Sequence, residues 1–500
     1  MVFRRQTAYQ ARLLSSNTIY DGLIEDDDIF EKILKVFDFN FIYDEVKHVY
    51  CDDNGRPPYD PVKLYKATLV QRLKNLSDPE MEYAARYDIR IKHFIGIPIE
   101  EFEFDFSTLS KFRTRLGSKL FERIFQKILS QIIKLGIIKN SEQQYIDSMP
   151  VLAHAALPSV ICLVYQGIKN VVKNSDESLK HEVFTKTNLT KEKLQHYSKA
   201  RPLFKLEDAE KKKAFEKAVN RARATIQLLE SKEFRSEELD TLKQIINENV
   251  DEKNQSVQTE RAIRTTIDPE AKLGHKTKEN LIFGYKNHAA VTQEGIITAV
   301  AITSAAEKDD KQIETIITKQ KEVGLKPKKM DADSAYGYIE TFKIAEKNGV
   351  ILNAPLRGLD ENNMSVYELK HDKKKNTLTC HNNICIKGNG LKFVFPIRQC
   401  KHCPKKEQCP LSPGKVAVLN KYHEVAREAI ARQRKNTEEK KLAKEKGLKP
   451  KTRLIIENVF AYLEKLGGKI TPYFGLGKTT IHVVAAATML NIMKTVRLLG

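Results

Sequence analysis

Apolar residues recur at helical spacing through the first part of the chain, between clear turn signals. One helix is predicted over residues 61–75, because proline suits the first helical position and the apolar residues that follow share a face. Ser77 and Glu80 have the spacing of a capping box, which predicts a second helix over residues 78–87. A third helix is predicted after Ser107. Three short helices with exposed basic side chains fit a DNA-docking unit, and an ordinary helical bundle fits the same pattern.

Strand patterns begin further along and alternate with helices. Strands are predicted over residues 144–151, 281–291, 296–302, 328–333 and 350–354. A short turn at Gly295 separates the second strand from the third, which predicts a β-hairpin. Two more helices are predicted near the C-terminus, over residues 454–466 and 479–498. This alternation indicates an α/β fold.

Two polar segments interrupt the alternation. Residues from about 163 to 265 are dominated by Lys, Glu, Asn and Gln, and residues from about 360 to 450 combine five cysteines with a Lys/Glu-rich helical stretch. Charged runs of this kind are usually solvated helix faces. We therefore interpret both segments as insertions into the α/β core.

The charge balance favours a polyanionic partner. The chain has 85 Lys+Arg and 65 Asp+Glu, a net charge of +20. Nucleic acid is the commonest such partner, although Lys-rich solvated surfaces explain the same balance. The most apolar C-terminal run, residues 483–493, is too short and too interrupted for a membrane span, so a buried helix and no membrane partner are expected. The first residues lack the apolar segment of an export signal, which predicts a cytoplasmic protein.

Three carboxylates stand beside apolar segments of the predicted core. Asp147 and Asp333 lie at or near the ends of strands, and Glu457 lies beside the apolar stripe of a helix. A carboxylate next to a buried face is costly unless it is hydrogen-bonded or binds a cation. If the three converge, divalent cations such as Mg²⁺ would relieve their mutual repulsion. The residue pattern alone does not single these three out among 65 acidic residues.

Short motifs in a fixed order supply a further argument. They occupy residues 55–61, 76–80, 105–116, 146–148, 268–272, 283–288, 332–336, 453–460 and 490–494. This order, over about residues 55–500, resembles DDE-type transposases of bacterial insertion sequences. The resemblance implies an α/β RNase H-like catalytic core with two large insertions, preceded by an all-α N-terminal DNA-binding domain. The expected units are a leader over residues 1–55, the DNA-binding domain over 56–118 and the catalytic domain over 119–500.

The same resemblance assigns roles to individual residues. Asp147, Asp333 and Glu457 match the family's acidic triad, which would hold two Mg²⁺ (or Mn²⁺) ions. Arg453, one helical turn before Glu457, would contact a DNA phosphate, and an ion pair with Glu457 is the alternative. The remaining expected DNA contacts are Lys111, Arg113, Arg115, Lys286 and His288.

The chain also departs from the family pattern. Asp147 is followed by Ser-Met-Pro where relatives often have Gly-Thr, and Lys465 is a doubtful match to the basic residue expected after the glutamate. Asp331 competes with Asp333, because residues two apart share a strand face. Asp333 is preferred, since Tyr336 reproduces the family's Asp-x-x-Tyr pattern.

Two other motifs suggest ligands. Five cysteines provide enough thiolates for a structural zinc site, with reduced thiols or an iron–sulfur cluster as alternatives: Cys380, Cys385, Cys400, Cys403 and Cys409. Residues 475–480 imitate the end of a phosphate-binding loop, but the first glycine of that motif would fall at Pro472 and no strand precedes it. Nucleotide binding is therefore not expected.

The sequence thus predicts a transposase that binds the terminal inverted repeats of its element and cuts and joins double-stranded DNA. The alternatives are an inactive DNA-binding descendant of a transposase and a metal-dependent nuclease without strand transfer. Family behaviour implies a homodimer in the synaptic complex, in which two DNA ends are held together.

Overall fold

The computed structural model describes residues 20, 22–50, 58–101, 104–138, 143–199, 208–251, 255–257, 261–275, 280–357, 365–404, 406–407, 409–411, 416–445 and 454–500. Arg453 and part of the first motif, residues 55–57, lie outside these ranges, as do residues 1–19 of the expected leader.

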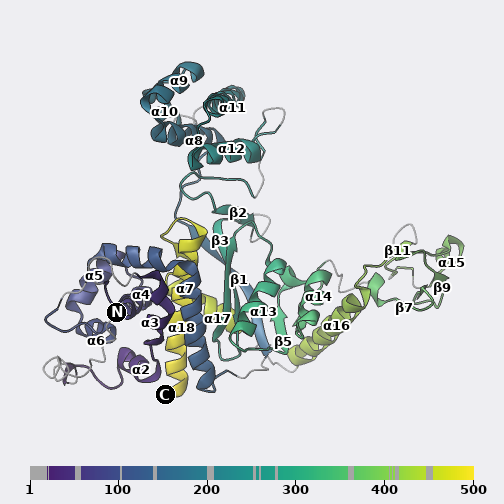
Figure 1. Cartoon of the computed structure of the whole chain (residues 1–500). Helices are drawn as coiled ribbons and strands as arrows, with labels where there is room; N and C mark the ends of the chain where they lie inside the picture. Colours follow the sequence, from purple (N-terminus) through teal and green to yellow (C-terminus); the bar gives the residue numbers. More distant parts are fainter. Residues whose placement is uncertain are drawn as a thin grey trace.

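Helices form the whole of the described N-terminal region (Figure 1). They are α2 (Ile29–Val36), α3 (Phe41–Val46), the 3₁₀ turn η1 (Lys47–Val49), α4 (Pro61–Leu73), α5 (Asp78–Tyr87), α6 (Ile89–Ile95) and α7 (Phe106–Lys134). The predicted capping box is confirmed: the Glu80 backbone N–H donates to the Ser77 hydroxyl, and the Ser77 N–H donates to the Glu80 carboxylate at 2.7 Å. The third predicted helix is confirmed as α7, which kinks at Gly117, whose φ of 67° suits glycine.

One hydrophobic core joins these helices to the rest of the protein. Phe30 of α2 and Ile42 of α3, in the segment expected to be a leader, are buried in it beside Leu69 of α4. The core continues past the kink in α7 and includes residues of the central sheet and of the C-terminal helix. The N-terminal helices are therefore not packed as a separate unit.

The described strands form a mixed seven-stranded sheet. They are β1 (Gln143–Ala153), β2 (Lys272–His275), β3 (Leu281–Val291), β4 (Ile297–Ser304), β5 (Lys329–Ala332), β6 (Ile351–Asn353) and β12 (Ile470–Thr471). The main path runs β2-β3-β1-β5-β6, with β4 paired to β3 and β12 to β1. Strand β1 is antiparallel to β3 and parallel to β5. The predicted β3–β4 hairpin is confirmed, and Gly295 in its turn has a φ of 80°.

Alternate residues of β1 face two different cores. Tyr145 and Met149 face the core shared with the N-terminal helices, α17 (Leu454–Lys465) and α18 (Leu476–Leu499). Ile146 faces a second core with α13 (Ile313–Glu322) and α14 (Ile339–Lys347). By this alternation Asp147 lies on the first side, which we call the Asp147 face. Ser148 and its cross-strand partner His288 lie on the second, the His288 face.

Both predicted insertions fold as structures with cores of their own, and Figure 1 shows them projecting from the sheet. The first contains α8 (Val160–Asn174), α9 (Glu177–Thr187), α10 (Lys191–Tyr197), α11 (Asp208–Ser231) and α12 (Glu237–Asn249). The second contains η5 (Val366–Glu368), β7 (Lys370–Asp372), β8 (Thr377–Thr379), β9 (Cys385–Lys387), β10 (Lys392–Val394), α15 (Ile397–Lys401), β11 (Val416–Val418) and α16 (His423–Glu445). Ala429 and Ile430 of α16 pack into the core of the His288 face, so this helix anchors the second insertion.

Helix α18 lies alongside α7 in the middle of the molecule (Figure 1). It is the one described helix long and apolar enough to cross a membrane, but 78% of its most apolar window is buried inside the protein. The expectation of a buried helix here is confirmed.

Candidate active site

Strands β1 and β5 bring Asp147 and Asp333 to the same level. The parallel register pairs Tyr145 with Asp331 and Ile146 with Ala332, so the next residues in line are Asp147 and Asp333. The Asp333 backbone is extended (φ −84°, ψ −177°), which continues the strand direction. Neighbouring strands are about 4.8 Å apart, and residues in line point to the same face. Both carboxylates are half-buried.

Asp331 is occupied by structural partners. Its carboxylate accepts hydrogen bonds from the side-chain amides of Gln143 and Asn353, the latter at 2.6 Å, and Lys329 lies 3.7 Å away. Asp333 instead accepts the N–H of Ala335 at 2.8 Å, capping the 3₁₀ turn η4 (Ser334–Tyr336). These contacts favour Asp333 over Asp331 as a metal-binding carboxylate.

The environment of Tyr336 shows that acidic side chains gather here. Burial raises the pKa of its hydroxyl well above the usual value, and the negative charges of four carboxylates raise it further. In order of effect they are Asp309, Asp147, Asp333 and Asp310. Asp309 and Asp310 belong to the 3₁₀ turn η3 (Asp309–Gln312), which the sequence analysis did not connect with the site.

Glu457 is not gathered with the two aspartates. It is exposed near the start of α17, whose Ile456 and Val459 are buried in the core of the Asp147 face. Within the described residues, no three His, Cys, Asp or Glu side chains lie close enough together to hold a metal ion. Asp147 and Asp333 offer the oxygen donors that Mg²⁺ prefers, so this pair fits a divalent cation although the three-carboxylate set is not assembled.

On the His288 face, Lys286 and Asp309 form a partly buried ion pair. Lys286 Nζ lies 2.8 Å from Asp309 Oδ1 and donates to the Glu307 carbonyl at 3.0 Å. The other Asp309 oxygen accepts the Ser148 hydroxyl at 2.7 Å, and the Ser148 N–H donates to Asp147. Lys286 was expected to contact DNA, but its ammonium serves this internal network, which braces the strand next to Asp147.

The prediction that His288 contacts DNA is wrong, because its side chain is fully buried. Its Nε2 lies 2.9 Å from the Thr303 hydroxyl, and its Nδ1 lies 3.5 Å from the Tyr336 hydroxyl. Burial lowers the pKa of His288 to about 4, so the ring is neutral at pH 7. Between Lys286 and His288, Asn287 points to the opposite side, the Asp147 face, and the sequence analysis missed it. Strand alternation within residues 283–288 is the signal that separates it from its neighbours.

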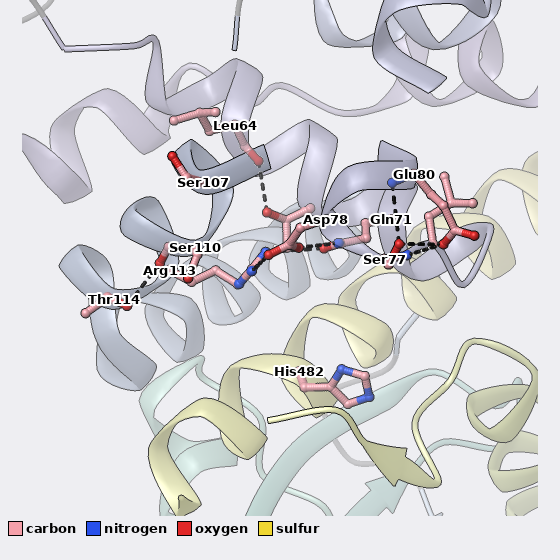
Figure 2. Close-up of polar contacts among 12 residues, drawn as sticks. Leu64, Gln71, Ser77, Asp78, Glu80, Ser107, Ser110, Arg113, Thr114 and His482 are labelled. Carbon is pink, nitrogen blue, oxygen red and sulfur yellow. Dashed lines mark hydrogen bonds and ion pairs between the residues drawn. The ribbon is translucent and has the colours of Figure 1, made fainter. Parts of the chain in front are cut away.

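The basic residues of α7 differ sharply in exposure. Lys111 and Arg115 are exposed, and the Arg115 guanidinium lies 4.8 Å from the centre of the Tyr50 ring. The expectation that Arg113 is exposed is wrong, because it is 6% exposed. Figure 2 shows its guanidinium directed at Asp78 of α5, with Gln71 of α4 bound to the same two residues. Arg113 thus holds α4, α5 and α7 together.

A second buried contact ties α4 to α18. His482 Nε2–H donates to the Gly467 carbonyl at 2.8 Å, and its Nδ1 therefore accepts a hydrogen bond from Arg72 at 2.7 Å. Burial, followed by the positive charge of Arg72, lowers the pKa of His482 to about 3. This contact joins residues that are 410 positions apart in the sequence.

The segment that imitates a phosphate loop is the capped start of α18. The Gly475 N–H donates to Asp268 at 3.1 Å, and the Leu476 N–H donates to Glu270 at 2.8 Å. Asp268 also accepts the Tyr285 hydroxyl. Two carboxylates therefore accept the N–H groups that a phosphate-binding loop would offer to a phosphate.

The cysteines do not form a ready-made metal site. Cys400 is buried in the small core of the second insertion, with Cys380 and Cys409 packed against it, whereas Cys385 is exposed. Cys403 lies in the turn after α15. No three of the five come close enough to share a metal in the described structure, and zinc binding stays a prediction from the sequence.

Comparisons with known proteins identify two regions of the chain. A family described as "Transposase domain (DUF772)" matches residues 18–115, and one described as "Transposase DDE domain" matches residues 250–492. No curated protein and no solved structure matches the chain. The two matched regions together cover about two thirds of the sequence, and the mixed sheet with its helices is consistent with an RNase H-like core. The chain belongs to the DDE transposases, enzymes of DNA transposition.

Proposed function

We propose that this transposase binds the terminal inverted repeats of its own element, cuts the DNA at its ends and joins them to a target. Asp147, Asp333 and Glu457 are the proposed triad. The observation that carries the proposal is the register of β1 and β5, which puts Asp147 and Asp333 side by side on the central strands.

This register matters because the matched DDE region begins at residue 250, after Asp147. The helical insertion separates β1 from the matched region in sequence, but β1 is hydrogen-bonded between β3 and β5, which both lie inside it. This pairing supports Asp147, on the central strand, as the first aspartate of the proposed triad.

Divalent cations held by these carboxylates would activate the attacking oxygen and stabilise the leaving oxygen of a phosphodiester. The chain's own groups prepare this chemistry. The Ser148 N–H orients Asp147, and the Ala335 N–H orients Asp333. Glu457 would complete the set by a shift of α17 relative to β1 when DNA and metal bind.

DNA contacts are proposed on exposed basic side chains. Lys111 and Arg115 meet this requirement in the N-terminal helices, and Arg453 stays a proposal from the family pattern. Because those helices share a core with the sheet, DNA bound to them is held at a fixed distance from Asp147. Two ends must be brought together in transposition, so a homodimer is the proposed active form, acting on DNA inside the cell.

The test is a strand-transfer assay with labelled end DNA, target DNA and Mg²⁺. The proposal expects nicked ends and joined products. Binding to the ends without nicking would indicate a DNA-binding protein only, and nicking without joining would indicate a nuclease. Either result would overturn the proposal of cutting and joining.

A further inference from the structure

Asn287 is the most unusual buried polar residue near the proposed site. It lies on β3 opposite Met149 of β1, with its side chain on the Asp147 face. It is 0% exposed, and neither its Oδ1 nor its Nδ2 has a hydrogen-bond partner. Its two neighbours in sequence, Lys286 and His288, both have partners on the other face.

An amide in this position is costly. Leaving a buried donor or acceptor without a partner costs about 1–3 kcal/mol for each group. A leucine has the same number and branching of side-chain heavy atoms and carries no such cost. Unsatisfied buried polar groups are rare in native proteins and are associated with strain, ions or function.

The sheet places one candidate partner within reach. Asp147 is opposite Ala289, and Asn287 is two residues from Ala289, so Asn287 and Asp147 are diagonal neighbours on one face. Diagonal neighbours on antiparallel strands are about 7–8 Å apart, a separation that two polar side chains turned toward each other can bridge. The Ser148 backbone N–H already donates to Asp147 Oδ1 at 2.7 Å.

We propose that Asn287 is a positioning residue for Asp147: its side-chain amide donates to the Asp147 carboxylate when that carboxylate binds a divalent cation. This rests on the proposed function, which makes Asp147 a metal ligand. A hydrogen bond to a ligating carboxylate fixes its orientation, and loss of such a partner typically weakens metal binding 10–100-fold.

The test compares Mn²⁺ binding by purified full-length variants, followed by the electron paramagnetic resonance signal of free Mn²⁺. Asn287→Leu is expected to weaken the site that is lost in Asp147→Asn by about 10–100-fold. Its melting temperature is expected to stay the same or rise, because an unsatisfied amide is removed. A purely structural asparagine would not combine weaker metal binding with unchanged or higher stability.

Met149→Leu is the matched control, since Met149 is opposite Asn287, lies two residues from Asp147 on the same strand, and is buried. It should bind Mn²⁺ like the wild type. If Asn287→Leu does not fold, the smaller Asn287→Ala is expected to show the same loss of affinity. Wild-type Mn²⁺ affinity in a folded Asn287 variant overturns this inference alone, whereas wild-type affinity in Asp147→Asn overturns the proposed function itself.

Discussion

The two faces of the central sheet differ in how the polar side chains near Asp147 are hydrogen-bonded. On the His288 face, Lys286, Asp309 and Ser148 bind one another, and His288 contacts Thr303 and Tyr336. On the Asp147 face, two half-buried carboxylates stand in line and Asn287 lacks any hydrogen-bond partner. Satisfied polar groups stabilise a fold, whereas a face with unmet hydrogen-bonding capacity is suited to bind something. The difference teaches that one face braces β1, while the other carries the carboxylates to which the proposed function assigns the chemistry.

The largest expected effect tests the carboxylates of the Asp147 face. Asp147→Asn or Asp333→Asn should lower DNA cleavage at least about a thousandfold, because loss of a metal ligand removes several kcal/mol of transition-state stabilisation. Asp331→Asn is the control on the same strand and should keep most activity, at a cost in stability from its broken contacts with Gln143 and Asn353. Equal losses in Asp331→Asn and Asp333→Asn would contradict this assignment.

The next effect tests the ion pair between Lys286 and Asp309 on the His288 face. Lys286→Met removes the partner of a partly buried carboxylate, so the free energy of unfolding should fall by about 2–4 kcal/mol. Urea denaturation measures this, and a double-mutant cycle with Asp309→Asn isolates the pair. The salt dependence of DNA binding should not change. A shallower salt dependence would show that Lys286 contacts phosphate after all.

Lowering the pH should destabilise the folded protein through His288, on the His288 face. The pKa of His288 is about 4 in the folded protein and near 6.5 in the unfolded chain. Its contribution to the free energy of unfolding is therefore complete above pH 6.5 and is lost as the pH falls toward 4. Between pH 6.5 and 5, the free energy of unfolding of the wild type should fall by about 1.5 kcal/mol more than that of His288→Gln, whose side chain cannot titrate. Melting curves across this range measure the difference. Parallel curves for the two proteins would mean that His288 is not buried in its neutral form.

The smallest effect concerns DNA binding at the surface. Lys111→Gln should weaken binding to end DNA a few-fold and reduce the slope of log affinity against log salt by about one, as expected for one lost phosphate contact. Lys119, exposed on the other side of the α7 kink, provides the comparison in Lys119→Gln. Identical behaviour of the two variants would remove Lys111 from the proposed DNA surface.

Local sequence signals predicted much of this fold. The capping box at Ser77, the β3–β4 hairpin and the strand at 328–333 depend on residues within a few positions of one another, and the structure confirms all three. The short strands of the second insertion were missed, because three residues are too few to show a period of two.

The errors concern contacts between distant segments. Arg113 was predicted to be exposed from the pattern of its own helix. In the structure it forms an ion pair with Asp78 on another helix and is buried there. For residues 286–288, alternation shows which side chains share a face but not which partners each face meets. The charges and hydroxyls of Asp309, Thr303 and Tyr336 come from later elements, and only the folded sheet reveals them.

The central place of α18 also constrains how the protein is made. Its start is capped by residues more than 200 positions earlier, and His482 bonds to Arg72, which is synthesised hundreds of residues before it. The core shared by the N-terminal helices and the sheet is therefore incomplete until α18 has been synthesised. A product truncated before residue 476 would lack the part of this core that α18 supplies.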